Sequence, residues 1–140
     1  MGDHSQLLAD LKAATEPSRE LDCRLAIAVG GFFIDGERYG EPAYCKHDPD
    51  GALIRPGQSG DMMVPRYTAS IDAAVRLARL VFPGVWWVVA EGQMTQAEPL
   101  YGCQLLFGHD AVVGEGESDA DPATAVCIAI IAAFSSEGRP

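Results

Sequence analysis

Residues 64–89, VPRYTASIDAAVRLARLVFPGVWWVV, decide the fold, because they predict a helix followed by a buried strand. Thr68 can cap the helix, since its hydroxyl can accept a hydrogen bond from a free backbone N–H of the first turn. Apolar residues recur every three or four positions over residues 68–82, which is typical of a helix that buries one face. The following Pro-Gly pair ends it. Residues 85–90 are apolar throughout and include both tryptophans, which favours a strand covered on both faces.

The composition predicts one globular domain over residues 1–140. The chain is long enough to bury a core, and its formal net charge is −10. An acidic chain is unsuited to nucleic acid, because phosphate binding needs an excess of Lys and Arg. No apolar run reaches the ~18 residues of a membrane span, and the N-terminus lacks the apolar segment of a secretory signal. We therefore expect a cytoplasmic protein that binds neither nucleic acid nor membrane.

Two short helices are expected at the N-terminal end. Residues 5–15 place leucines at helical spacing. Ser18 can cap a second helix, and the pair Gly30-Gly31 ends it in the way that C-terminal glycines do. The two helices can fold back as a hairpin or lie end to end, and the sequence is compatible with both.

Residues 32–63 are closely punctuated by glycine and proline, which predicts an irregular segment. Within it, residues 43–46 and 52–54 could form a small hairpin around a turn at 47–51, where Asp-Gly and proline favour a reversal. Long irregular segments in compact domains are often functional, so this segment is a candidate for contacts.

The C-terminal half predicts further strands. Residues 101–107 fit a strand, and residues 111–113 fit a short antiparallel neighbour. Residues 114–119, GEGESD, are expected to be an acidic, glycine-rich loop. This loop lacks the Lys-Ser/Thr pair of a phosphate loop, and its acids Glu115 and Glu117 would repel phosphate, so we interpret it as a solvated loop.

The last helix is expected over residues 122–134, with Asp121 as its N-cap and a proline at its first position. Its residues are almost all apolar, and two explanations are open. The helix can lie under other elements of its own chain, or it can form a homo-oligomer interface. Residues 135–140 are expected to fray.

The four cysteines are scattered, and none forms a C-x-x-C pair. Cys23, Cys103 and Cys127 lie in apolar segments and are interpreted as buried thiols. Cys45 lies two residues from His47, a spacing compatible with a metal site or with a Cys-His nucleophile. Metal sites usually bring a second ligand cluster, and a catalytic cysteine needs a base placed by the fold, so we expect no metal, no cofactor and no catalytic residues.

One hypothesis for a ligand site concerns the start of the 68–82 helix, where free N–H groups favour an anion. Nearby arginines and aromatic rings would suit a nucleotide-like ligand, and the two tryptophans point to opposite faces of their strand. The simpler interpretation is that the aromatic rings pack in the core and that the arginines are solvated. The candidate ligand-binding residues are Arg66, Tyr67, Thr68, Arg76, Trp86 and Trp87.

Three stretches together resemble the phage ABA (alpha-beta-alpha) sandwich domain family, which comprises small proteins of phages and prophages. They are PRYTxSIDAA from residue 65, the strand with the tryptophans, and DxDPAxAxCxA from residue 119. We would expect threonine before the proline of the last helix, where this chain has Asp121, and either residue can cap. The resemblance covers residues 65–92 and 119–134 well. It implies a sheet layered between helices, and it implies no reaction.

The expected fold is α/β (α+β), with a small, mainly antiparallel sheet sandwiched between helices in three alpha-beta-alpha layers. The expected function is that of a non-enzymatic phage or prophage accessory protein that binds a host protein, since an acidic surface suits a basic partner. There are two alternatives. One is a protein that binds a small anionic ligand and thereby sequesters a host nucleotide immune signal. The other is a hydrolase-like enzyme that uses Cys45 and His47.

Overall fold

The computed structural model describes residues 4–34, 37–39, 46–47, 52–54, 62–93, 99–108 and 111–137. It confirms a mixed α/β fold with a small antiparallel sheet. The helices are α1 (Ser5–Ala13), α2 (Arg19–Ala28), α3 (Ile71–Val81) and α4 (Pro122–Glu137). The strands are β1 (Phe32–Ile34), β2 (Glu37–Tyr39), β3 (Lys46–His47), β4 (Ala52–Ile54), β5 (Met62–Met63), β6 (Trp86–Gln93), β7 (Pro99–Phe107) and β8 (Ala111–Ser118).

The main sheet has the order β6-β7-β8, and both pairs are antiparallel. Strands β6 and β7 extend beyond the expected ranges of 85–90 and 101–107. Of the hairpin predicted between residues 43–46 and 52–54, the antiparallel pairing of Lys46 with Ile54 is confirmed, whereas His47, which was expected in the turn, belongs to β3 and pairs with Leu53. Residues 43–45 of the expected first strand and 48–51 of the expected turn lie outside the described residues. Strand β4 also pairs antiparallel with β5.

Helix α4 forms the centre of the core. Every residue from Ala123 to Ile131 is at most 2% exposed, because α4 packs against β7, β8, α1 and α3. The first of the two explanations for its apolar sequence is therefore correct. The homo-oligomer interface expected through residues 122–134 gains no support, because residues 123–131 are already buried within the chain. The helix also continues to Glu137, past the expected start of the frayed tail at 135.

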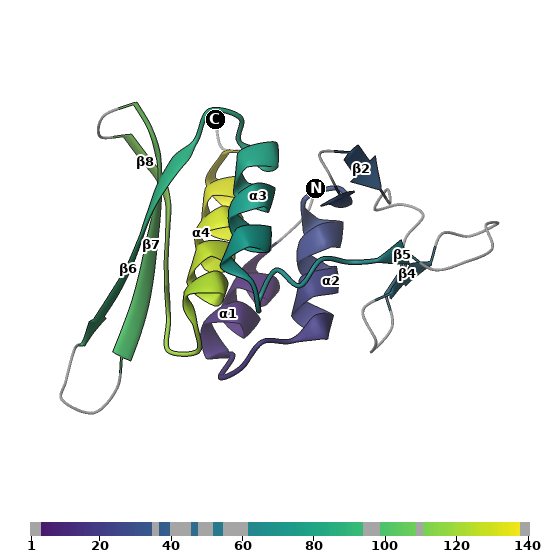
Figure 1. Cartoon of the computed structure of the whole chain (residues 1–140), viewed down its shortest axis with the longest axis horizontal. Helices are drawn as coiled ribbons and strands as arrows, with labels where there is room; N and C mark the ends of the chain where they lie inside the picture. The colour runs from purple at the N-terminus through teal and green to yellow at the C-terminus, as the bar shows by residue number, and fades with distance from the viewer. Residues whose placement is uncertain are drawn as a thin grey trace.

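The layer order differs from the expected alpha-beta-alpha sandwich. The described helices all lie on one side of the β6-β7-β8 sheet, with α4 packed against it, α3 beside α4, and α1 and α2 farther away (Figure 1). On the other face, Trp86 is 41% exposed and Val88 is 45% exposed. Strand β6 is therefore covered on one face, and the expectation of helices on both faces does not hold for the described residues.

The expected loop at 114–119 is wrong, because residues 114–118 form the second half of β8. Gly114 and Gly116 face α4, and a Cβ on Gly116 would lie 2.7 Å from the backbone N of Ala129. The alternating Glu115 and Glu117 face away and are exposed. Glycine thus serves here to let the strand approach the helix backbone closely, which is one of its roles within a strand.

The N-cap of α3 differs from the predicted Thr68. Ser70 is the cap, and its Oγ accepts a hydrogen bond from Ala73 N at 3.2 Å. Thr68 lies two residues earlier and is fully buried. The end of the helix is as predicted, since Gly84 turns the chain with a φ of 88°.

The N-terminal helices form a hairpin, one of the two arrangements that the sequence allowed. Asp10 of α1 and Arg24 of α2 form an ion pair at 2.7 Å, which requires the helices to lie side by side. Ser18 caps α2 as predicted, because its Oγ accepts from Leu21 N at 3.2 Å. Gly30 and Gly31 follow the helix with positive φ angles.

Candidate functional site

The candidate site is the face of the main sheet that points away from α4, which we call the open sheet face. The strand register identifies its members, because directly paired residues in antiparallel strands share a face. Strand β6 contributes the edge, β7 the centre and β8 the other edge. The members are Trp86, Val88, Ala90, Gly102, Gln104, Leu106, Val112, Glu115 and Glu117.

One end of the open sheet face is apolar. Leu106 of β7 lies between Trp86 of β6 and Val112 of β8 in the register. Leu106 is buried, whereas Trp86 and Val112 are 41% and 42% exposed. The indole N–H of Trp86 donates to the carbonyl oxygen of Gly108 at 2.7 Å, and this hydrogen bond holds the ring at the end of the sheet.

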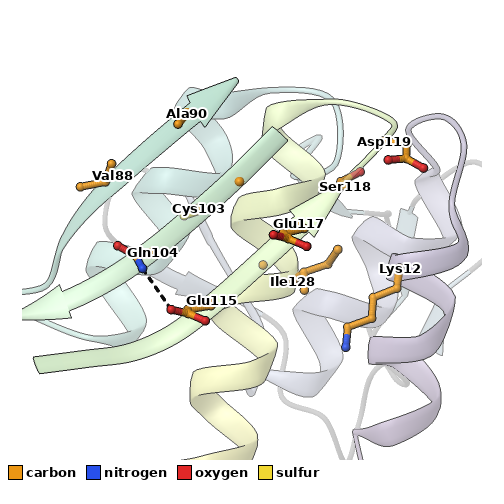
Figure 2. Close-up of a pocket in the computed structure, with 12 residues that line it drawn as sticks. Lys12, Val88, Ala90, Cys103, Gln104, Glu115, Glu117, Ser118, Asp119 and Ile128 are labelled. Atoms are coloured by element: carbon orange, nitrogen blue, oxygen red, sulfur yellow. Dashed lines mark hydrogen bonds between the residues drawn. The ribbon is translucent and has the colours of Figure 1, made fainter. Parts of the chain in front are cut away.

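The other end of the open sheet face is acidic along β8. Glu115 and Glu117 are exposed there, and Gln104 Nε2 donates to a carboxylate oxygen of Glu115 at 3.0 Å. An open cavity of about 720 Å³ reaches from Val88 across these strands to Lys12 of α1. Figure 2 shows the two glutamates on β8, with Lys12 on the helix beyond this edge strand. The cavity thus has apolar residues on β6, Val88 and Ala90, and negative charge on β8.

The residues predicted to bind a ligand do not line this cavity. Tyr67 is 2% exposed and lies in the hydrophobic core, which supports the simpler interpretation of its role. Arg66 and Arg76 are exposed on the surface. Neither arginine lies on the strands that form the open sheet face, so the structure gives these residues no common pocket there.

The two tryptophans occupy opposite faces of β6, as predicted from strand geometry. Trp87 points toward the helices, where the guanidinium of Arg79 lies 5.3 Å from the centroid of its ring. Trp86 lies on the open sheet face. One tryptophan is therefore partly enclosed under α3, and the other belongs to the candidate site.

Thr68 belongs to a buried polar cluster that sequence reasoning missed. Asp22 of α2 is 1% exposed and accepts hydrogen bonds from Thr68 N at 2.7 Å and Thr68 Oγ1 at 2.8 Å. Arg19 Nη1 donates to the same carboxylate at 2.7 Å, and Nη2 donates to the carbonyl oxygen of Val64. The cluster ties α2 to residues 64–68. Its groups bind one another in the interior, so its role is structural.

The described cysteines are unsuited to nucleophilic chemistry. Cys23, Cys103 and Cys127 are buried, as predicted. Burial raises the pKa of Cys103 to about 12, and burial raises the pKa of Cys127 well above its usual value. Both thiols are therefore protonated at neutral pH, whereas the thiolate is the reactive form. Cys45 and the side chain of His47 lie outside the described residues.

Among the described residues, no group of three His, Cys, Asp or Glu side chains is placed to hold a metal ion. None of the helices in the described ranges combines the length and the apolarity needed to cross a bilayer. Comparison of the chain with protein-family models, with curated proteins and with solved structures finds no match at the significance required.

Proposed function

We propose that this chain is a non-enzymatic binding protein that holds a partner protein against its open sheet face. The observation that carries the proposal is the exposure of Trp86, Val88 and Val112, each more than 40% exposed on one face of one sheet. The solvated face of an antiparallel sheet normally carries polar residues in alternation with the buried ones. Exposed apolar side chains gathered on one face and bordered by polar residues mark an interaction site.

The composition of the face favours a protein over a small anion. Tryptophan is enriched among the residues that dominate binding energy at protein interfaces, and Trp86 is held in place by its hydrogen bond to Gly108. Glu115 and Glu117 would repel a phosphate group. The nucleotide-sequestering alternative gains no such support, because its arginines, Arg66 and Arg76, lie off this face.

The resemblance of residues 65–92 and 119–134 to a phage family supports a phage or prophage origin, and with it a host protein as the partner. The cytosol is the proposed site of action. Its support is the pair of buried cysteines Cys103 and Cys127, neither of which forms a disulfide, since such thiols are compatible with a reducing compartment.

The test compares Val88→Glu on the open sheet face with Ile71→Glu, which changes a similarly exposed apolar residue at the start of α3. Tagged wild-type and variant proteins, each checked for folding by circular dichroism, are used to capture proteins from a lysate of the host. Mass spectrometry identifies what is bound. We expect one identified protein to be retained by the wild type and Ile71→Glu but lost with Val88→Glu.

Two outcomes would count against the proposal. Retention of the same protein by Val88→Glu would move the binding site away from the open sheet face. If the wild type retains no protein but a small molecule is released on denaturation, the sequestering alternative would replace protein binding.

A further inference from the structure

The shape of the open sheet face restricts what can cover it. Three strands spaced ~4.8 Å apart give a surface whose outer strand axes are about 10 Å apart. An α-helix with its side chains is ~10–12 Å wide, so one helix laid along the strands would span β6 to β8. An added strand would instead pair with the edge of β6 or β8, and it would leave Val88 and Trp86 uncovered.

The negative charge on the open sheet face is confined to the β8 side. Val88 and Ala90 lie on β6, whereas Glu115 and Glu117 lie on β8. Among the described residues that line this cavity, Lys12 alone is cationic. A helix on this face would therefore need an apolar stripe toward β6 and β7 and basic side chains toward β8. Such one-sided complementarity also sets the orientation of the bound helix.

The spacing of the two glutamates suits a helical partner. Residues two apart on a strand are separated by ~6.7 Å along it, and Glu115 and Glu117 point to the same side of β8. Residues four apart on a helix rise ~6.0 Å and lie on the same side. Two basic residues at positions i and i+4 of the partner can thus meet the two carboxylates.

A second copy of the chain fits the same face poorly. Each copy carries a formal net charge of −10, and its own open face brings Glu115 and Glu117 to the contact. Among the described residues of that face and its border, Lys12 alone could neutralise the two carboxylates.

We infer that the open sheet face binds an amphipathic α-helix of a partner protein, with the apolar stripe of that helix over Trp86 and Val88 and Lys or Arg residues spaced i, i+4 facing Glu115 and Glu117. This inference rests on the proposed function. It specifies the class of partner, namely a basic amphipathic helix, and it places a helix layer on the face that the chain's own described helices leave open (Figure 1).

The experiment uses the full chain and three 18-residue synthetic peptides. The first peptide has leucines at i, i+3, i+4 and i+7 spacing and a lysine flank at i, i+4 spacing. The second replaces the lysines by glutamates, and the third contains two central prolines that prevent a helix. Isothermal titration calorimetry measures the dissociation constants. We expect the lysine peptide to bind and the other two to bind at least about tenfold more weakly.

Paired protein variants isolate the role of the two carboxylates. Glu115→Gln/Glu117→Gln removes two negative charges from the open sheet face, and Glu16→Gln/Glu20→Gln removes two from the α1–α2 corner. We expect the first pair to weaken binding of the lysine peptide about 2- to 30-fold, as befits two exposed charge pairs. The second pair should leave the dissociation constant within about twofold of the wild type.

Four results would overturn the inference, and the last of them leaves the proposed function standing. The first is equal weakening by the two double variants, and the second is equal binding of the proline peptide. The third is a wild-type dimer in sedimentation that Val88→Glu converts to a monomer, which would assign the face to a second copy. If Val88→Glu abolishes capture of the host protein while Glu115→Gln/Glu117→Gln does not alter it, the proposed function stands and the basic helix is refuted.

Discussion

Replacing Gly116 by alanine should destabilise the protein severely, although the change adds one methyl group. The new Cβ would lie 2.7 Å from Ala129 N, 2.8 Å from Ile128 Cβ and closer still to the carbonyl oxygen of Ala125. Non-bonded carbon atoms prefer separations of about 3.5–4.0 Å, so β8 and α4 would have to separate by roughly 1 Å. Two of these three contacts are backbone atoms of α4, which cannot rotate away.

The expected cost follows from the position of α4. This helix is enclosed by β7, β8, α1 and α3, so its displacement would loosen several interfaces together. Overpacking a core costs ~1–3 kcal/mol and occasionally more, and we expect about 3 kcal/mol because the obstacle is main chain. With a urea m-value of about 2 kcal/mol per molar, the unfolding midpoint should fall by about 1.5 M.

The matched control is Gly102→Ala on β7. Gly102 faces the open side of the sheet, and its added Cβ would meet Gly116 O at 3.9 Å, an ordinary contact. Neither Gly102 nor Gly116 has a positive φ, so backbone strain does not distinguish the two substitutions. We expect Gly102→Ala to change the unfolding free energy by less than about 0.5 kcal/mol. Unfolding is monitored by far-UV circular dichroism. Equal urea midpoints for the two variants would refute the proposed packing of β8 on α4.

Three further outcomes are expected. Thr68→Val should lower the free energy of unfolding in urea by about 2 kcal/mol, because it removes the hydroxyl hydrogen bond to buried Asp22. Thr68→Ser keeps a hydroxyl and should retain most of the wild-type stability. An unchanged urea midpoint for Thr68→Val would contradict a stabilising role of this hydrogen bond. The pKa of Cys103 is raised from 9.0 to about 12, so its contribution to stability is present below pH 9 and is lost as the pH rises toward 12. Thermal unfolding from pH 8 to 11 should therefore show a steeper loss of stability in the wild type than in Cys103→Ala, and parallel curves would exclude the effect. Acrylamide should quench the fluorescence of Trp87→Phe, which retains Trp86 on the open sheet face, more strongly than that of Trp86→Phe; the reverse order would contradict the assigned faces.

The elements of the fold were predictable where their signals are local. Ser18 and Asp121 were identified as helix caps because a cap bonds a backbone N–H only two or three residues away. Pro83-Gly84 and Gly30-Gly31 were identified as helix ends for the same reason. The opposite facing of Trp86 and Trp87 follows from strand geometry alone.

The errors arose where a distant partner decides the outcome. Thr68 has the side chain of a good cap, but Asp22, 46 residues away, accepts its hydrogen bonds, and Ser70 caps α3 instead. Residues 114–118 have the composition of a loop. They form a strand because glycines at 114 and 116 let α4 approach, and no pattern within the strand itself reveals that helix.

The sequence by itself determined the mixture of helices and strands, most of their ends and the acidic character of the chain, since these depend on residue type and near neighbours. Only the tertiary structure decided the candidate site. The run of apolar residues at 85–90 indicates a strand that can be buried on both faces. Whether other elements cover both faces depends on the packing of the whole chain. Because α4 occupies one face and the other described helices pack behind it, Trp86 and Val88 remain exposed, and the binding surface is the face that the chain's own described helices do not cover.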